Sequence, residues 1–336
     1  MGVYSDLDPA ALRAALRQWG RGEPTAVTPT PLGIENSNFF VTLQTPGGTA
    51  SEWVLTVMDH APAECGLRVL NILDSAGLPV PAPVASTTGE TVLAVDGHPA
   101  LLAPRLHGEH PQQTTPAQCA AAGRFLGRMH RLTAGLAGPA HPRDLAWLER
   151  GWSRHHRCLG APKRALMRRA INGINHASLR SDHQALPQGL VHGDLFRDNA
   201  MLLGDRLGGV IDFHHAARAP LLFDLAVVAN DWCFGADLRP DPQRMLALLQ
   251  AYDGERRLTI VEFWFWPVML TLAALRFWVA RLNSPRKPPE EMAAHLEAVL
   301  ADPPLLTPDR LRFGAGSAAP LVDAPRTNPW AGRRFS

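Results

Sequence analysis

The stretch that decides the fold is VHGDLFRDNAML, residues 191–202 of a chain of 336 residues. It sets His192, Asp194 and Asn199 in the pattern His-x-Asp-x-x-x-x-Asn between two apolar runs. The next segment, AMLLGDRLGGVI, predicts two short strands around a Gly-Asp turn, and Asp212 follows directly after it. Because a hairpin returns to its starting point, we expect Asn199 and Asp212 to lie close together.

These side chains suit phosphoryl transfer. Mg²⁺ prefers oxygen ligands, so the Asn199 amide oxygen and the Asp212 carboxylate are expected to hold it together with phosphate oxygens. Asp194 is placed to orient an attacking hydroxyl and accept its proton. A catalytic-loop Asp, an Asn shortly after it and a metal-holding Asp after a hairpin make up the kinase signature. His192 is expected to be a buried scaffold residue that hydrogen-bonds the loop, not the base.

Composition and charge narrow the class of protein. Hydrophobic residues make up 46% of the chain, which is typical of a globular protein with a core. The 33 basic and 31 acidic residues leave a net charge of +2, which gives no case for a nucleic-acid partner. The N-terminus has no basic region followed by an apolar core, and the longest apolar run, 263–275, is too short to span a bilayer. We expect a cytoplasmic protein without a membrane partner.

Turn signals and hydrophobic periodicity divide the chain into a β-rich part and a helical part. Residues 1–103 are expected to form a nucleotide-binding lobe, in which a Pro-Gly-Gly turn and an Asp-Gly turn each join two strands. Residues 104–108 are expected to form a hinge, 109–310 a helical catalytic and substrate lobe, and 311–336 an irregular tail. The predicted fold class is α+β. It is a two-lobed, protein-kinase-like fold with a small N-terminal antiparallel sheet and one helix, and a larger, mostly helical C-terminal lobe.

Several segments resemble the aminoglycoside phosphotransferase and choline kinase superfamily. The resemblance rests on HGDLFRDN and IDF, with glycine in place of the arginine of the protein-kinase loop. The resemblance narrows to the bacterial homoserine kinase branch, because further segments spread over residues 33–282 occur together. These segments are GIENSNFFV, WVLTV, GLPVPAPV, FDLAVVANDWC and LRFWVARL. The resemblance implies transfer of the ATP γ-phosphate to the hydroxyl of L-homoserine, in threonine biosynthesis. It also implies Mg²⁺ as cofactor and ATP and L-homoserine as small-molecule partners.

The same resemblance implies roles for individual residues. Asp194 would be the catalytic base, and Asn199 and Asp212 would be the magnesium ligands. The nucleotide would contact a loop that covers the phosphates and a hinge that meets the adenine. These nucleotide-binding candidates are Gly33, Ile34, Glu35, Asn36, Ser37, Asn38, Pro104, Arg105 and Leu106.

One position departs from the protein-kinase pattern. Protein kinases carry a lysine on the third strand that pairs with the phosphates, and Thr56 stands at that position here. Arg105, Arg197 or a second metal would then neutralise the phosphate charge. Arg197, within the catalytic loop, is also a candidate for the substrate side of the site.

Homoserine is a zwitterion, so its site needs a partner for the ammonium and another for the carboxylate. Asp231, helped by Asn230 and Trp232, is the candidate for the ammonium group. Arg276, on an apolar helix, is the candidate for the carboxylate, and a structural ion pair with Asp224 or Asp231 is an equal alternative. Asp224 is expected to cap a helix and brace the catalytic loop.

Two alternative functions stay open from the sequence. The first is a kinase of the same fold that acts on another alcohol, such as an aminoglycoside, choline or an amino sugar. A cationic substrate of that kind would favour an acidic pocket, and the helical lobe is not unusually acidic. The second is a non-catalytic nucleotide-binding pseudokinase. The intact Asp194, Asn199 and Asp212 argue against it, and the missing strand lysine argues mildly for it.

Overall fold

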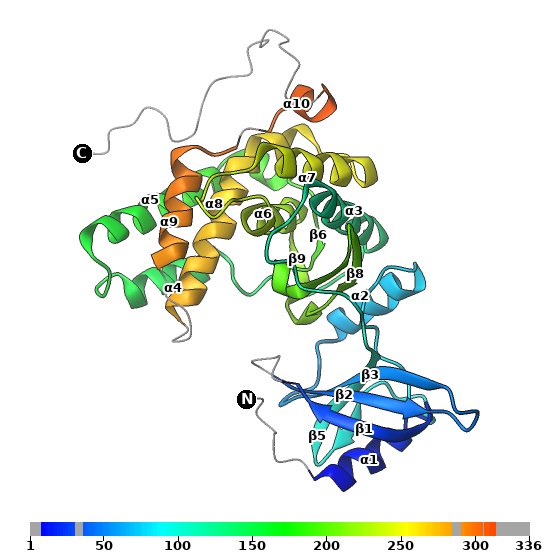
Figure 1. Cartoon of the computed structure of the whole chain (residues 1–336). Coiled ribbons are helices and arrows are strands. Elements are labelled where there is room, and N and C mark those ends of the chain that lie inside the picture. The colour runs from blue at the N-terminus through cyan, green and yellow to red at the C-terminus, as the bar shows by residue number, and fades with distance from the viewer. Residues whose placement is uncertain (1–7, 31–35, 284–289, 305, 314–336) are drawn as a thin grey trace. The chain divides into compact units, whose positions relative to one another are not determined.

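The computed structural model describes residues 8–30, 36–283, 290–304 and 306–313 (Figure 1). The chain forms two compact units. The β-rich unit consists of Met1–His110 and Asn199–Ala216, and the helical unit consists of Pro111–Asp198 and Ala217–Ser336.

A five-stranded antiparallel sheet forms the centre of the β-rich unit. Both predicted hairpins are present in it. In the second hairpin, the turn residues Asp96 and Gly97 have positive φ values of 51° and 80°. This is the backbone conformation expected of an Asp-Gly hairpin turn. In spatial order the strands are β1 (Glu23–Pro29), β2 (Ser37–Gln44), β3 (Ala50–Val57), β5 (His98–Pro104) and β4 (Leu93–Val95).

The core of the β-rich unit lies between this sheet and helix α1 (Pro9–Arg17). Asp8 caps the helix, with its side chain accepting a hydrogen bond from the N–H of Ala10. Its apolar residues Leu12 and Leu16 join the inward-facing strand residues in one buried cluster. Each such side chain stabilises the fold by roughly 2 kcal/mol through burial. Helix α2 (Glu64–Ser75) fills the region predicted to be helical between β3 and β4.

The hairpin that follows the decisive stretch packs with the β-rich unit, although the sequence placed it in the C-terminal lobe. It consists of β7 (Ala200–Leu203) and β8 (Arg206–Val210). Glu109 and Leu202 exchange two backbone hydrogen bonds of 3.0 and 2.9 Å. The N–H of Val210 donates to the carbonyl of Pro79 at 2.9 Å. These contacts join segments far apart in the sequence, and local patterns do not report them.

Helices dominate the second unit, and side-chain caps mark the beginnings of several of them. Thr115 and Thr259 each form a capping box, and Asp241 accepts hydrogen bonds from the first turn of its helix. Figure 1 shows α3 beside α7, where a Cβ at Gly123 would come within 2.2 Å of the carbonyl oxygen of Leu248. The helices are α3 (Pro116–Leu132), α4 (Leu145–His155), α5 (Ala161–Ser178), α6 (Leu221–Trp232), α7 (Pro242–Glu255), α8 (Ile260–Leu282), α9 (Glu290–Ala301) and α10 (Pro308–Phe313).

Helix α8 is the most apolar element of the helical unit. By length and composition it is the one helix among the described residues that would be able to cross a membrane. However, 67% of its most apolar window is buried inside the protein, which is the pattern of a core helix.

Three features were not predicted. Strand β1 was missed, and so was the short ladder of β6 (Gln188–Val191) with β9 (Ala217–Pro220). Helix α10 includes the first residues of the predicted irregular tail, and residues 314–336 lie outside the described part of the chain.

Candidate active site

Asn199 and Asp212 lie at the open end of the β7–β8 hairpin, as the sequence predicts. Ala200 pairs with Val210, and the N–H of Ile211 donates to the carbonyl of Asn199 at 3.0 Å. The hairpin therefore brings these two predicted metal ligands together within the β-rich unit. Asp194 belongs to the helical unit.

Asp212 has the features expected of a residue held in place for a ligand. Its φ is 67°, a left-handed conformation that few residues other than glycine adopt. Its Oδ1 atom is buried and accepts no hydrogen bond from the described residues, and the Nε2 atom of His214 lies 3.9 Å away. Because buried carboxylate oxygens normally have a partner, this oxygen fits a cation ligand.

The predicted nucleotide loop enters the described structure at Asn36. The side-chain amide of Asn36 lies 3.2 Å from Nε2 of His214, in the short helix η3 (Phe213–His215) that follows Asp212. Asn36 thus lies next to the short helix that follows the predicted metal ligand Asp212. Ser37 and Asn38 open strand β2, and the predicted loop residues Gly33, Ile34 and Glu35 lie outside the described residues.

At the strand position that carries lysine in protein kinases, Thr56 is hydrogen-bonded to Asn38, so both side chains there are neutral. The hydroxyl of Thr56 donates to Oδ1 of Asn38 at 2.8 Å across the β2–β3 pair. In the hinge, the Arg105 guanidinium pairs with Glu52 at 2.9 Å and stacks 4.1 Å from the centre of the Phe40 ring. Arg105 is therefore engaged within its own unit.

Pro104 and Leu106 flank Arg105 in the predicted hinge. Pro104 is the last residue of β5, and it pairs with Trp53 of β3. Leu106 packs closely on Gly209 of the β7–β8 hairpin. A Cβ atom added to Gly209 would come within 2.8 Å of the Leu106 side chain.

In the helical unit, Asp224 braces the catalytic loop. Its two carboxylate oxygens accept hydrogen bonds from the N–H groups of His192 at 2.7 Å and Gly193 at 2.6 Å. His130 of α3 adds a third hydrogen bond, 3.0 Å from its Nε2 atom. Burial works to raise the pKa of Asp224, but the hydrogen bond and charge of His130 hold it below its ordinary value. The loop therefore rests on an ionised, buried carboxylate.

The expected capping role of Asp224 is not what the structure shows. Asp224 lies inside the first turn of α6, and Pro220 occupies the cap position. His192 is fully buried, and its Nδ1 atom accepts a hydrogen bond from the N–H of Asp194 at 3.2 Å. Asp194 itself is half-buried, on a loop that these hydrogen bonds hold.

Arg197 and Asp231 form an ion pair. The N–H and Nε of Arg197 donate to one carboxylate oxygen of Asp231 at 2.7 and 3.2 Å, and Nη2 donates to the other at 3.3 Å. A further donation goes to the carbonyl of Gln112. Burial raises the pKa of Asp231, and the charge of Arg197 opposes this effect. Each residue thus partly satisfies the charge of the other.

The remaining substrate candidates on α6 are tied to neighbouring helices. The side-chain amide of Asn230 donates to the carbonyl of Leu270 at 2.9 Å, and its oxygen lies 3.2 Å from Nε2 of His295. Trp232 is fully buried. Arg276 makes no ion pair with Asp224 or Asp231 in the described part of the chain. Its Nη2 instead donates to the carbonyl of Gly193 at 3.2 Å.

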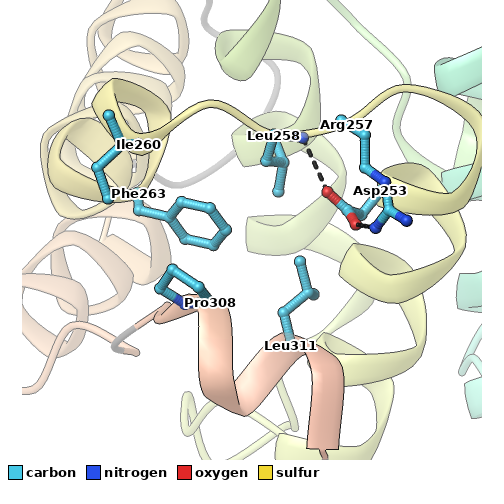
Figure 2. Close-up of a pocket in the computed structure, with 7 residues that line it drawn as sticks. All are labelled: Asp253, Arg257, Leu258, Ile260, Phe263, Pro308 and Leu311. Atoms are coloured by element: carbon cyan, nitrogen blue, oxygen red, sulfur yellow. Dashed lines mark hydrogen bonds and ion pairs between the residues drawn. The ribbon is translucent and has the colours of Figure 1, made fainter.

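Figure 2 shows a pocket elsewhere in the helical unit, between the end of α7, the start of α8 and α10. Within it, Asp253 accepts hydrogen bonds from the N–H of Leu258 at 2.8 Å and from Arg257 at 2.6 Å. None of the predicted site residues lines this pocket. Its lining consists of Asp253, Arg257, Leu258, Ile260, Phe263, Pro308 and Leu311.

Sequence reasoning missed His130 and its neighbours. His130 is 2% exposed, and its Nδ1 atom lies 2.8 Å from the Tyr252 hydroxyl, which accepts a hydrogen bond from Arg256 at 3.1 Å. The available signal was a histidine on the apolar face of a predicted helix, next to Met129. A buried histidine needs polar partners, but the sequence does not say which.

The fold and the motif define a phosphotransferase of the kinase-like class, with a β-rich unit, a helical unit and a His-x-Asp-x-x-x-x-Asn loop followed by a hairpin and Asp212. Residues 26–258 match the phosphotransferase enzyme family, and the chain belongs to this family.

Relatives in sequence point to one branch. The chain is 39% identical over 288 residues to the homoserine kinase of Pseudomonas aeruginosa strain UCBPP-PA14, which covers 84% of this chain and 88% of the relative. It is 36% identical over 295 residues to the homoserine kinase of Methylobacillus flagellatus, covering 84% and 87%.

Solved structures that resemble the chain share its fold at low identity. A microcompartment-associated aminopropanol kinase has a TM-score of 0.65 at 19% identity, with 87% of this chain and 95% of that chain covered. An amicoumacin kinase in complex with AMP-PNP and Ca²⁺ has a TM-score of 0.63 at 17% identity, with coverage of 87% and 92%.

Proposed function

We propose that this protein is a homoserine kinase, which transfers the γ-phosphate of ATP to the side-chain hydroxyl of L-homoserine. The product, O-phospho-L-homoserine, serves threonine biosynthesis in the cytoplasm. The observation that carries the proposal is the 39% identity to a homoserine kinase across 84% of the chain. The intact His-x-Asp-x-x-x-x-Asn motif and the orphaned carboxylate oxygen of Asp212 support it.

In this proposal Asp194 acts as the catalytic base. Its carboxylate orients the homoserine hydroxyl and accepts its proton as the oxygen attacks the γ-phosphorus. The bond between the γ-phosphorus and the bridging oxygen breaks, and ADP leaves. The contacts of Asp224 with the two N–H groups before Asp194 fix the loop, so that the carboxylate is positioned before substrate arrives.

Mg²⁺ fits the oxygen ligands at the end of the hairpin. Asn199 and Asp212 would hold it, and the metal would neutralise phosphate charge when bound. We assign this neutralisation mainly to metal, because Thr56 is neutral and Arg105 and Arg197 are each paired with a carboxylate. The backbone of the Gly33–Asn38 loop and of the hinge residues Pro104–Leu106 would contact ATP.

The substrate side of the proposal lies in the helical unit. Asn230, Asp231, Trp232 and Arg197 are the residues from which contacts to homoserine are proposed. Arg276 is left out of this set, because its guanidinium is buried and donates to the carbonyl of Gly193 in the catalytic loop.

A substrate panel tests this function. The purified protein would be incubated with Mg·ATP and, separately, L-homoserine, 3-aminopropan-1-ol, choline and kanamycin, and phosphorylated products would be measured by ³¹P NMR. L-2-Aminobutyrate, which lacks the hydroxyl, is the matched control. We expect kcat/KM for L-homoserine to exceed the others by about 100-fold or more. Higher kcat/KM for another alcohol would refute the assignment.

A further inference from the structure

Arg276 is a charged residue in the middle of the apolar helix α8, and only 1% of it is exposed. Its Nη2 donates to the carbonyl of Gly193 at 3.2 Å. Its Nε and Nη1 atoms are buried without a hydrogen-bond partner among the described residues. Burying a cation with unpaired donors destabilises a fold, so the position calls for an explanation other than stability.

The guanidinium of Arg276 lies over the ring of Phe223, 4.7 Å from its centre, and several charged groups act on it. Burial is the main effect that lowers the pKa of Arg276, and the charge of Arg143 lowers it further. The charges of Asp194 and Asp224 raise it, and the resulting pKa is about 9. Arg276 is thus cationic at neutral pH. Asp224 is already occupied by His192, Gly193 and His130. The charge of Arg276 also interacts with the carboxylate of Asp194.

Helix α8 contacts the catalytic loop on both sides of Asp194. Arg276 holds the carbonyl of Gly193, the residue before Asp194. The ring of the adjacent Phe277 packs edge-on against Phe196, with ring centres 4.0 Å apart. Gly193 has a φ of 77°, a left-handed conformation that glycine adopts freely because it has no Cβ. Contacts to its N–H and its carbonyl together fix the peptide that leads into Asp194.

We propose that Arg276 is a positioning residue of the catalytic loop. It fixes the peptide before Asp194, and its cation supports the carboxylate form of that residue, at a cost to the stability of the fold. The inference rests on the proposed function only in taking Asp194 as the base. Because the guanidinium is buried, this role differs from direct contact with the substrate carboxylate.

The test compares Arg276→Met, which keeps the length and removes the charge and donors, with Arg276→Lys, which keeps the charge. Arg281→Met, on the same helix, is the control. For Arg276→Met we expect kcat to fall about 100-fold with both KM values changed less than about 3-fold, because a misplaced base slows chemistry without weakening binding. The melting temperature should be unchanged or higher, since a buried unpaired donor set is removed. The acid limb of the kcat–pH profile should move to higher pH.

Arg276→Lys should keep the acid limb in place and recover part of kcat. Three results would overturn the proposal. One is an Arg276→Met protein that fails to fold or melts well below the wild type. Another is a kcat equal to that of the Arg281→Met control. The third is a large rise in the KM for homoserine at unchanged kcat, which would make Arg276 a substrate ligand. Wild-type turnover in the same assay reports separately on the proposed function.

Discussion

Asp224→Asn tests the brace under the catalytic loop. The wild-type carboxylate is fully buried and accepts three hydrogen bonds, of 2.6, 2.7 and 3.0 Å. An asparagine has one acceptor oxygen in place of two. That oxygen can replace the one shared by His192 and His130, and the new amide NH₂ then faces the N–H of Gly193.

The magnitude follows from those contacts. One buried N–H loses its acceptor, which costs about 1–3 kcal/mol, and the other two hydrogen bonds lose the assistance of the charge. We expect the free energy of unfolding to fall by about 3 kcal/mol. Because Gly193 immediately precedes Asp194, kcat should also fall by about 100-fold in the folded protein.

Urea unfolding followed by circular dichroism would measure the stability change, and steady-state kinetics at a temperature where both proteins are folded would measure kcat. Asp253→Asn is the matched control, because Asp253 is 7% exposed and accepts a hydrogen bond from a backbone N–H, but at the end of α7. It should lose stability and keep kcat within about 2-fold, since its hydrogen bonds are with Arg257 and Leu258, far along the chain from the catalytic loop. If Asp224→Asn retained the wild-type kcat, the bracing argument would be refuted.

Three further predictions concern the hairpin, a buried histidine and helix packing. In Asp212→Asn, the asparagine can adopt the left-handed backbone but carries no charge. The melting temperature should therefore stay the same, while kcat should fall at least about 100-fold at saturating Mg·ATP. An unchanged kcat would exclude Asp212 as a metal ligand. Burial lowers the pKa of His295 to about 4. This pKa lies below that of a histidine in the unfolded chain, about 6.5, so the folded state is favoured by the neutral imidazole. The free energy of unfolding should therefore fall as the pH falls, by about 2 kcal/mol between pH 7 and pH 5. Urea unfolding of His295→Gln should show a smaller pH dependence, and identical curves would contradict this. Gly123→Ala forces a Cβ within 2.2 Å of the Leu248 carbonyl oxygen, so the melting temperature should drop by several degrees; an unchanged value would show that α3 and α7 separate easily.

Local sequence chemistry predicts most of the elements of this fold. Thr115 with Gln118, and Thr259 with Glu262, form capping boxes that mark the beginnings of α3 and α8. The Asp-Gly turn at Asp96 marks the β4–β5 hairpin. These signals act over three or four residues, so one sequence is enough to find them. The same reasoning places Asn199 beside Asp212.

Long-range pairings are where sequence reasoning fails. The β6–β9 ladder pairs residues that a hairpin and a short helix separate, and each strand is only four residues long. The ion pair of Arg197 with Asp231 joins two residues that the sequence treated separately, Arg197 as a candidate for the phosphates or the substrate side and Asp231 as the candidate for the substrate ammonium. The sequence identifies which polar groups need partners. It does not identify the partners, because the choice depends on how distant helices pack.

The most direct test of the account is the kinetics of Asp194→Asn with L-homoserine and Mg·ATP, alongside nucleotide binding by isothermal titration calorimetry. The substitution keeps the shape of the side chain and removes the proton acceptor. We predict a dissociation constant for ATP within about 3-fold of wild type and a kcat reduced by about 1,000-fold, in the range typical of a lost general base. A kcat equal to that of the wild type would contradict the central claim that Asp194 is the catalytic base of a homoserine kinase.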